Sequence, residues 1–267
     1  MDKISSLKSI HHSYTEISEY LKTTAKKHSN YRHYSNYIDN ILNSRSLYLS
    51  DGSKWEDRID SNNFTKLVDN KANYGLCFTY SMSESVAIWK LYAPKGAMLN
   101  LTKSMMDKII ENTDEVKLGQ FIDGDFVTIH TCRVNKEDVF CIDMLYYDTI
   151  PSERKEYKQN DGEKNYRVRH SDEPLAYIEK TLIQRMEHVK KCMPWSYEKE
   201  CRLVIRLDKS IVEKANMNKQ NKEEPLTMCV PIDCIDKERL KERIVDSPCS
   251  ETNRYKRSTL KDKVVFR

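Results

Sequence analysis

The chain has 267 residues, of which 39% are apolar and 32% are charged, and it contains only 6 Gly and 7 Pro. This balance excludes collagen-like, low-complexity and wholly disordered proteins, and it is typical of an ordered chain with one large domain. The 45 Lys and Arg residues against 41 Asp and Glu residues give a net charge of +4, too small a surplus to establish a polyanion-binding surface.

Three kinds of sequence feature are missing, and each absence argues against a class of function. The six glycines are too dispersed to form a G-x-G-x-x-G or G-x-x-x-x-G-K-[ST] phosphate-binding loop. No apolar run is long enough to span a membrane, and the N-terminus lacks the apolar segment of a secretion signal, so we expect a cytoplasmic protein without membrane contact. The eight cysteines include no C-x-x-C pair, which favours reduced, packed thiols, and no metal site is predicted.

The first elements predicted are helical. Apolar residues at three- and four-residue steps predict an amphipathic helix over about the first twenty-five residues, and we expect residues 1–28 to be an N-terminal helical appendage. These apolar residues are Ile4, Leu7, Ile10, Tyr14, Ile17 and Leu21. We expect residues 29–267 to form a single α+β domain, in which a second short helix passes through Ile38 and Leu42.

Short strands and helices alternate in the next part of the chain. A strand over 46–49 leads into a polar loop, and a buried strand over 75–79 follows. A helix over 83–93 and a strand over 97–101 come next, and Thr102 is suited to cap the helix after them.

The middle of the chain predicts an antiparallel pair and then a long helix. Segments 125–134 and 138–147 are expected to be adjacent strands, so the sheet should be mixed but mostly antiparallel. The charged segment 152–170 is interpreted as a solvated surface insertion. A helix is then predicted to begin near Pro174, because an apolar stripe follows that consists of Leu175, Ile178, Leu182, Met186 and Val189.

Three strands are predicted in the last quarter, over 195–207, 227–232 and 264–266, with a short helix over 236–243. The first of them alternates with period two. One face would carry Tyr197, Cys201, Leu203, Ile205 and Leu207, and the other Glu198, Glu200, Arg202 and Arg206. Two carboxylates on one strand face can project into one cleft, where either the arginines or a cationic ligand must neutralise them. The alternative is an ion-paired strand edge in solvent.

Several motifs occur in an order that resembles a known family. They are Tyr31-Arg32, Leu47-Tyr48-Leu49-Ser50-Asp51, Cys77-Phe78-Thr79, Ile88-Trp89-Lys90-Leu91-Tyr92-Ala93 with Gly96, and Lys191-x-x-x-Trp195-x-Tyr197-Glu198-x-Glu200-x-Arg202. From about residue 31 to the C-terminus the chain resembles domain-of-unknown-function family twenty-nine seventy-one, an uncharacterised bacterial family. The last motif is the most distinctive, although Cys201 stands where that family usually has Trp.

The order of these motifs is similar in turn to that of ADP-ribosyltransferases. The resemblance implies an ADP-ribosyltransferase-like sheet core, NAD as the substrate, Glu200 as the catalytic glutamate and Glu198 as the residue that orients the acceptor. Loss of nicotinamide builds positive charge on the anomeric carbon of ribose, and a fixed carboxylate stabilises that charge. The resemblance also implies a toxin or anti-phage defence effector, with a regulatory or neutralising protein as its partner.

On this interpretation a second group of residues binds NAD: Arg32, His33, Ser50, Asp51, Trp89, Tyr92, Lys191, Trp195 and Arg202. Only one of Arg32 and His33 should face the pyrophosphate or the adenosine ribose, since neighbours on a strand point to opposite faces. Trp89 and Tyr92 share a helix face and would form a nicotinamide wall. Each residue also has a structural interpretation, as a strand edge, a turn, a core aromatic or a cation that stabilises a helix end.

Two other functions stay open. Asp143, Asp148 and the triplet Glu153-Arg154-Lys155 are similar to the carboxylate and E-x-K arrangement of a Mg²⁺-dependent nuclease. A non-catalytic sensor domain that binds nucleic acid or protein would use the same Glu and Arg residues only for salt bridges. If the chain does use NAD, the acceptor of ADP-ribose could be a nucleic acid, a protein side chain or water.

Overall fold

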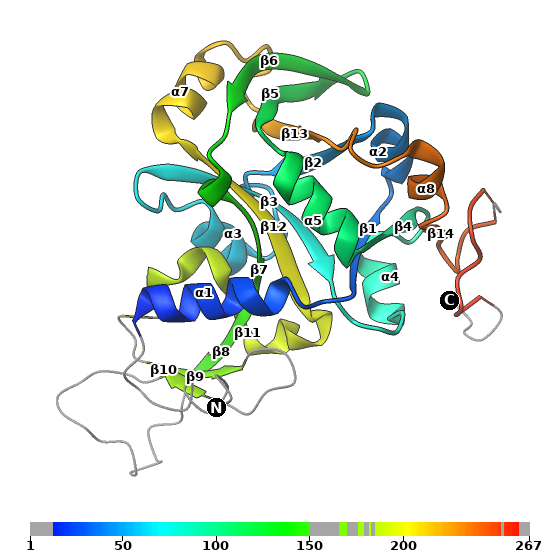
Figure 1. The fold of residues 1–267 in the computed structure, drawn as a ribbon, viewed down its shortest axis with the longest axis horizontal. Helices are drawn as coiled ribbons and strands as arrows, with labels where there is room; N and C mark the ends of the chain where they lie inside the picture. The colour runs from blue at the N-terminus through cyan, green and yellow to red at the C-terminus, as the bar shows by residue number, and fades with distance from the viewer. Residues whose placement is uncertain are drawn as a thin grey trace.

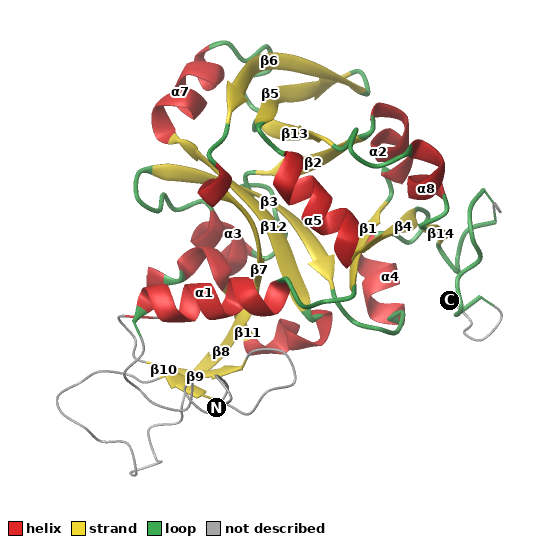
Figure 2. Cartoon of the chain, viewed as in Figure 1, coloured by secondary structure: helices red, strands yellow, loops and turns green. Residues whose placement is uncertain are grey.

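The computed structural model describes residues 13–149, 166–169, 176–178, 182, 185–251 and 254–261. Strands and helices alternate along this part of the chain, and the strand pairs are antiparallel except for one parallel pair, so the predicted α+β class with a mostly antiparallel sheet is confirmed (Figures 1 and 2). None of the described helices is long and apolar enough to cross a membrane.

The main sheet has ten strands. They are β1 (Asn30–Ser35), β2 (Ser46–Ser50), β3 (Lys71–Thr79), β4 (Ala97–Thr102), β5 (Glu115–Ile122), β6 (Asp125–Arg133), β7 (Val139–Asp143), β12 (Glu200–Asp208), β13 (Thr227–Pro231) and β14 (Ile244–Asp246). A smaller sheet contains β8 (Leu145–Thr149), β9 (Tyr166–Arg169), β10 (Ala176–Ile178) and β11 (Lys190–Cys192).

The main sheet branches at β3. One edge of β3 pairs with β12 along its whole length, and β7 lies beyond β12. The other edge pairs with β1 only at Thr79 and with β2 only at Gly75. Two wings therefore diverge from β3, one running β1-β4-β14 and the other β2-β13-β5-β6 (Figure 1).

Seven α-helices are described, and they pack around the two sheets (Figure 2). They are α1 (Tyr14–Ala25), α2 (Ile38–Ser44), α3 (Arg58–Phe64), α4 (Val86–Tyr92), α5 (Lys103–Asn112), α7 (Lys209–Met217) and α8 (Lys237–Lys241). Thr102 caps α5 as predicted, because its hydroxyl accepts a hydrogen bond from the backbone N–H of Met105.

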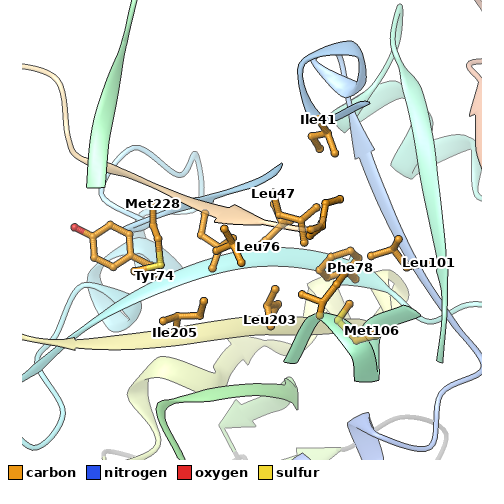
Figure 3. Close-up of a cluster of buried hydrophobic side chains, with 14 of the residues drawn as sticks. Ile41, Leu47, Tyr74, Leu76, Phe78, Leu101, Met106, Leu203, Ile205 and Met228 are labelled. Atoms are coloured by element: carbon orange, nitrogen blue, oxygen red, sulfur yellow. The ribbon is translucent and has the colours of Figure 1, made fainter. Parts of the chain in front are cut away.

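The largest core lies between the wings. Tyr74 and Leu76 point from one face of β3 toward side chains of the second wing, whereas Phe78 on the same face lies beside Leu101 of β4. Leu203 and Ile205 of β12 lie beside them (Figure 3). All six side chains are buried. Because successive strand residues point to opposite faces, Gly75, Cys77 and Thr79 are left for the other face of β3.

The first helix is packed against the sheet. Ile17 and Leu21 of α1 are buried against Phe140 and Ile142 of β7. The predicted appendage is thus a covering layer of the sheet over its described part. The first three residues of the predicted stripe, Ile4, Leu7 and Ile10, lie outside the described residues.

The predicted pairing of segments 125–134 and 138–147 is wrong. Strand β6 pairs instead with β5, and β7 pairs with β12. The β5–β6 turn explains this choice, since Asp123 and Gly124 both have positive φ angles, as a tight hairpin requires. The second segment is also divided between β7 and β8, which belong to different sheets.

The helix predicted from Pro174 has the wrong bounds. Residues Ala176–Ile178 form β10, Leu182 and Arg185 are α-helical, a 3-10 helix spans Glu187–Val189, and β11 follows directly. Met186 and Val189 are nevertheless buried beside α1, so the apolar stripe marks burial and not a continuous helix. The segment 152–170 is described only over β9, and the predicted strand 264–266 lies outside the described residues.

Candidate functional site

A cleft of about 380 Å³ opens where β1 and β2 separate from β3. The two branch points, Thr79 and Gly75, are four residues apart, which corresponds to about 13 Å along a strand. Residues of β1, β2, β3, α3 and α4 line the cleft, together with the 3-10 helix Met193–Glu198 and the first residue of β12.

Most of the predicted site residues meet in this cleft. Those that line it are Arg32, His33, Ser50, Tyr92, Lys191, Trp195, Glu198 and Glu200. Asp51, Trp89 and Arg202 do not line it. The sequence thus identified the neighbourhood, but several individual roles need to be corrected.

Five charged side chains form one buried group at the Thr79 end, which we call the carboxylate cluster. The Nζ atom of Lys191 lies 2.5 Å from Oε2 of Glu198 and 2.8 Å from Oε2 of Glu200. The Nε atom of Arg202 lies 2.5 Å from Oε1 of Glu200. Asp60 of α3 lies 2.5 Å from Nη2 of Arg202 and 3.7 Å from Nζ of Lys191. None of the five side chains is more than 6% exposed, so these interactions are shielded from water.

The two glutamates do not share a strand face as predicted. A 3-10 helix with Pro194 in its first turn ends at Glu198, and Lys199 then adopts a left-handed conformation with φ of 46°. Strand β12 begins only at Glu200. This turn at Lys199 brings both carboxylates to the ammonium of Lys191. Tyr197, predicted to face the core, is 43% exposed for the same reason.

The carboxylate cluster shifts the pKa values of its two glutamates in opposite directions. Burial alone would raise the pKa of Glu200, but the charges of Arg202 and Lys191 outweigh it and hold that pKa well below its ordinary value. Burial and the negative charge of Glu200 raise the pKa of Glu198 above its ordinary value, against the opposing effect of Lys191. Glu200 is therefore a fixed anion, whereas Glu198 is suited to take up and release a proton.

Lys191 and Arg202 hold the glutamates; Lys191 also lines the cleft, and Arg202 does not. Burial disfavours the charge of Lys191, but Glu200 and Glu198 more than offset this and raise its pKa. Arg202 is fully buried, and its guanidinium lies 4.5 Å from the ring centroid of Trp55, which lines the cleft. The predicted cofactor contact of Arg202 is thus replaced by a positioning role.

The facing wall of the cleft comes from β1. Arg32 donates from Nη2 to the carbonyl oxygen of Met82 at 2.8 Å, while its Nε and Nη1 are buried without a hydrogen-bond partner among the described residues. The hydroxyl of Tyr34, a residue only 8% exposed, lies beside Arg32; burial raises its pKa, and the charge of Arg32 opposes that rise. Both residues line the cleft, although these particular atoms are themselves buried.

His33 lines the cleft together with Arg32, although only one of the two was expected to do so. Its Nδ1 lies 3.0 Å from the carbonyl oxygen of Cys77 and must carry the hydrogen there, because a carbonyl oxygen only accepts. Burial lowers the pKa of His33, so the ring is neutral and its Nε2 is an acceptor. Both residues reach the cleft because β1 pairs with β3 at a single position.

The remaining predicted residues divide between the cleft and the scaffold. Tyr92 donates its hydroxyl to Oε1 of Glu198 at 2.5 Å. Trp89 is fully buried, packs edge-on against Tyr34 and donates to Glu84, so it belongs to the core. Asp51 accepts from the backbone N–H of Ser53, which is the role of a residue that starts a turn.

Sequence reasoning missed Asp60, Tyr34 and Trp55. The sequence does indicate that Asp60 lies in the first turn of a helix, because Asp57 is a typical N-cap residue. In the structure the side chain of Asp57 accepts from the N–H groups of Ile59 and Asp60. Tyr34 could have been found because it shares a strand face with Arg32. No local pattern pointed to Trp55.

The residues suggested for a metal-dependent nuclease are described only in part. Asp143 is fully buried, and its Oδ1 lies 2.7 Å from Nε2 of His28. The triplet 153–155 lies outside the described residues. Within the described part of the chain, no group of three or more His, Cys, Asp or Glu side chains could hold a metal ion.

Comparisons of the chain with protein-family models, with curated proteins and with solved structures find no match. The resemblance to domain-of-unknown-function family twenty-nine seventy-one, and through it to ADP-ribosyltransferases, therefore stays a prediction from the motifs in the sequence.

Proposed function

We propose that this cleft binds NAD and cleaves the bond between nicotinamide and ribose, as an ADP-ribosyltransferase-like enzyme does. The observation that carries the proposal is the carboxylate of Glu200, which lines the cleft and is held ionised by Arg202 and Lys191. A fixed anion of this kind stabilises the positive charge that develops on the anomeric carbon as nicotinamide leaves.

The charge balance of the carboxylate cluster supports the same chemistry. Its three carboxylates face two cations, so the fully ionised cluster has an excess of one negative charge. In NAD the nicotinamide ring is cationic, and as it leaves, the positive charge passes to the oxocarbenium-like ribose. That charge would compensate the excess negative charge of the cluster in the transition state, whereas the neutral nicotinamide that leaves would not compensate it.

Glu198 would complete the reaction. When the carbon–nitrogen bond breaks, its electron pair stays with nicotinamide, and the acceptor oxygen or nitrogen then attacks the anomeric carbon. The proton lost by the acceptor would pass to Glu198, whose raised pKa suits a general base. Tyr92 fixes the orientation of that carboxylate through its hydroxyl.

The facing wall would bind the phosphate part of NAD. Arg32 and Tyr34 line this wall, and a guanidinium and a phenol hydroxyl are groups that match phosphate oxygens. The resemblance of the motifs adds a biological setting, that of a bacterial toxin or anti-phage defence effector. It also leaves a nucleic acid, a protein or water as the acceptor.

The test is to incubate the purified chain with NAD, with and without cell lysate as a source of acceptors, and to measure free nicotinamide. Glu200→Gln keeps the shape of the side chain and removes its charge. Glu213→Gln is the matched control, because Glu213 is an exposed glutamate on α7 that is paired only with Lys209 among the described residues.

We expect release by the unaltered chain and by Glu213→Gln, and a loss of about a hundredfold or more in Glu200→Gln. Release that requires lysate would indicate a transferase, and release without lysate a glycohydrolase. The proposal would be wrong if the unaltered chain released no nicotinamide in either condition, or if Glu200→Gln released it at the same rate.

A further inference from the structure

A second feature of the cleft has no part in the chemistry at Glu200. The ring of Tyr48, which lines the cleft from β2, has its centroid 4.9 Å from that of Phe121 and 5.4 Å from that of Phe126. The two phenylalanine rings lie 5.5 Å apart. We call these three rings the aromatic platform. Tyr48 lines the cleft, and the other two rings, which pack against it, belong to β5 and β6 of the outer wing (Figure 1).

The platform is held in place but is not covered. Phe121 and Phe126 are paired in register on either side of the β5–β6 turn, and Phe121 is still 39% exposed. Gly119 makes room for one of the rings, since a Cβ atom there would lie 2.7 Å from Cζ of Phe126. Rigid, partly exposed aromatic side chains beside a cleft are suited to stack against a flat ligand group.

The surroundings of the platform favour a nucleobase over other flat or apolar groups. Asp123 and Asp125 flank the turn, and both are exposed. Their carboxylates are acceptors for an exocyclic amino group, and they repel phosphates and anionic lipids. An adenine ring offers both a flat face and such an amino group.

We infer that the aromatic platform binds the adenine ring of NAD, so that the dinucleotide lies along β3 with its nicotinamide end at the carboxylate cluster. This inference rests on the proposed function for the identity of the ligand. Glu200 of the carboxylate cluster pairs with Thr79 of β3, and Ser50, on the strand that carries Tyr48, pairs with Gly75. These two positions on β3 are about 13 Å apart, so the two ends of an extended dinucleotide have separate binding regions.

The test is calorimetric binding of ADP-ribose and of nicotinamide mononucleotide to the full chain. ADP-ribose carries the adenine, and nicotinamide mononucleotide does not. The variants are Phe121→Ala, the conservative Phe121→Trp, and Tyr37→Ala as a control that removes an aromatic side chain 72% exposed and not part of the cleft lining. Neither ligand requires turnover, so the result does not depend on the chemistry.

We expect Phe121→Ala to weaken ADP-ribose binding by about tenfold or more, as loss of a base-stacking ring does, and to leave nicotinamide mononucleotide binding unchanged. Phe121→Trp and Tyr37→Ala should both retain ADP-ribose binding. The inference would be overturned if ADP-ribose did not bind the unaltered chain, if Phe121→Ala bound it normally, or if that variant lost both ligands equally.

The two proposals can fail separately. Selective loss of ADP-ribose binding in Phe121→Ala, without any nicotinamide release by the unaltered chain, would leave the adenine site standing and contradict the proposed reaction. Nicotinamide release that depends on Glu200, with unchanged ADP-ribose binding in Phe121→Ala, would support the proposed reaction and contradict the adenine site.

Discussion

Two buried ion clusters lie on the same face of β12, four residues apart. The carboxylate cluster surrounds Arg202, and the other consists of Asp138, Arg206 and Lys71. Arg206 Nη2 lies 2.9 Å from Oδ1 of Asp138, and Lys71 contacts the other oxygen of that carboxylate. In sequence the two arginines are equivalent, since both are predicted to alternate with the same apolar residues.

The two clusters differ in charge balance and in surroundings. The second has one carboxylate and two cations, its cationic side chains are 17% and 21% exposed, and it does not line the cleft. The carboxylate cluster has an excess of carboxylates and borders the cleft. A buried ion pair is therefore not by itself a sign of function. An uncompensated charge that faces a cavity is the better one.

The largest difference is expected in stability when each arginine is removed. Arg202→Leu leaves Asp60 and Glu200 buried without their main partner and should cost about 3–5 kcal/mol of unfolding free energy. Arg206→Leu should cost about 1 kcal/mol, because Asp138 keeps its contact with Lys71. Urea unfolding of both variants measures the difference, and equal costs would contradict the distinction between the clusters.

The next effect is a pH dependence of the unfolding free energy, in which Glu200 and Glu198 contribute with opposite signs. The folded pKa of Glu200 lies below its ordinary value of 4.5, so its stabilising contribution is complete above that pH and is lost as pH falls. The folded pKa of Glu198 lies above 4.5, so its contribution is complete below that pH and is lost as pH rises through the folded pKa.

Unfolding free energies between pH 3 and pH 7 test this assignment. Glu200→Gln should flatten the acidic side of the stability profile, and Glu198→Gln the side toward neutral pH, each by at most about 1.4 kcal/mol per pH unit. The opposite pattern would mean that Glu198 is the fixed anion.

The smallest expected effect concerns Tyr92. Its hydroxyl stabilises the ionised form of Glu198, so Tyr92→Phe should raise the pKa of that carboxylate further and slow nicotinamide release by about two- to fivefold at neutral pH. The pH profile of the rate should shift upward by less than about one unit. A loss as large as that expected for Glu200→Gln would show that Tyr92 does more than orient Glu198.

Much of the fold could be predicted from the sequence because single elements have local signals. Short apolar runs identified the region of β3 and β13, and the hydroxyl before α5 marked its cap. The pairing of β6 was missed because β5 was not predicted, although its buried Val116 and Leu118 alternate with exposed residues.

The geometry of the site was harder to predict. Alternation around Glu198 continues through a 3-10 helix and a left-handed Lys199, so period two alone could not locate the start of β12. Asp60 enters the cluster from a helix 142 positions away in sequence from Arg202. Such long-range contacts leave no local pattern, and the role of Lys191 could be assigned only once they were known.

One measurement tests the central claim most directly, namely nicotinamide release per folded molecule by Glu200→Gln and Asp138→Asn, compared side by side with the unaltered chain. Each substitution removes one buried carboxylate charge, and unfolding curves supply the folded fraction. We predict a loss of about a hundredfold or more for Glu200→Gln and a change within about twofold for Asp138→Asn, even though Asp138→Asn is also less stable. Equal losses in the two variants, or full activity in Glu200→Gln, would contradict the account.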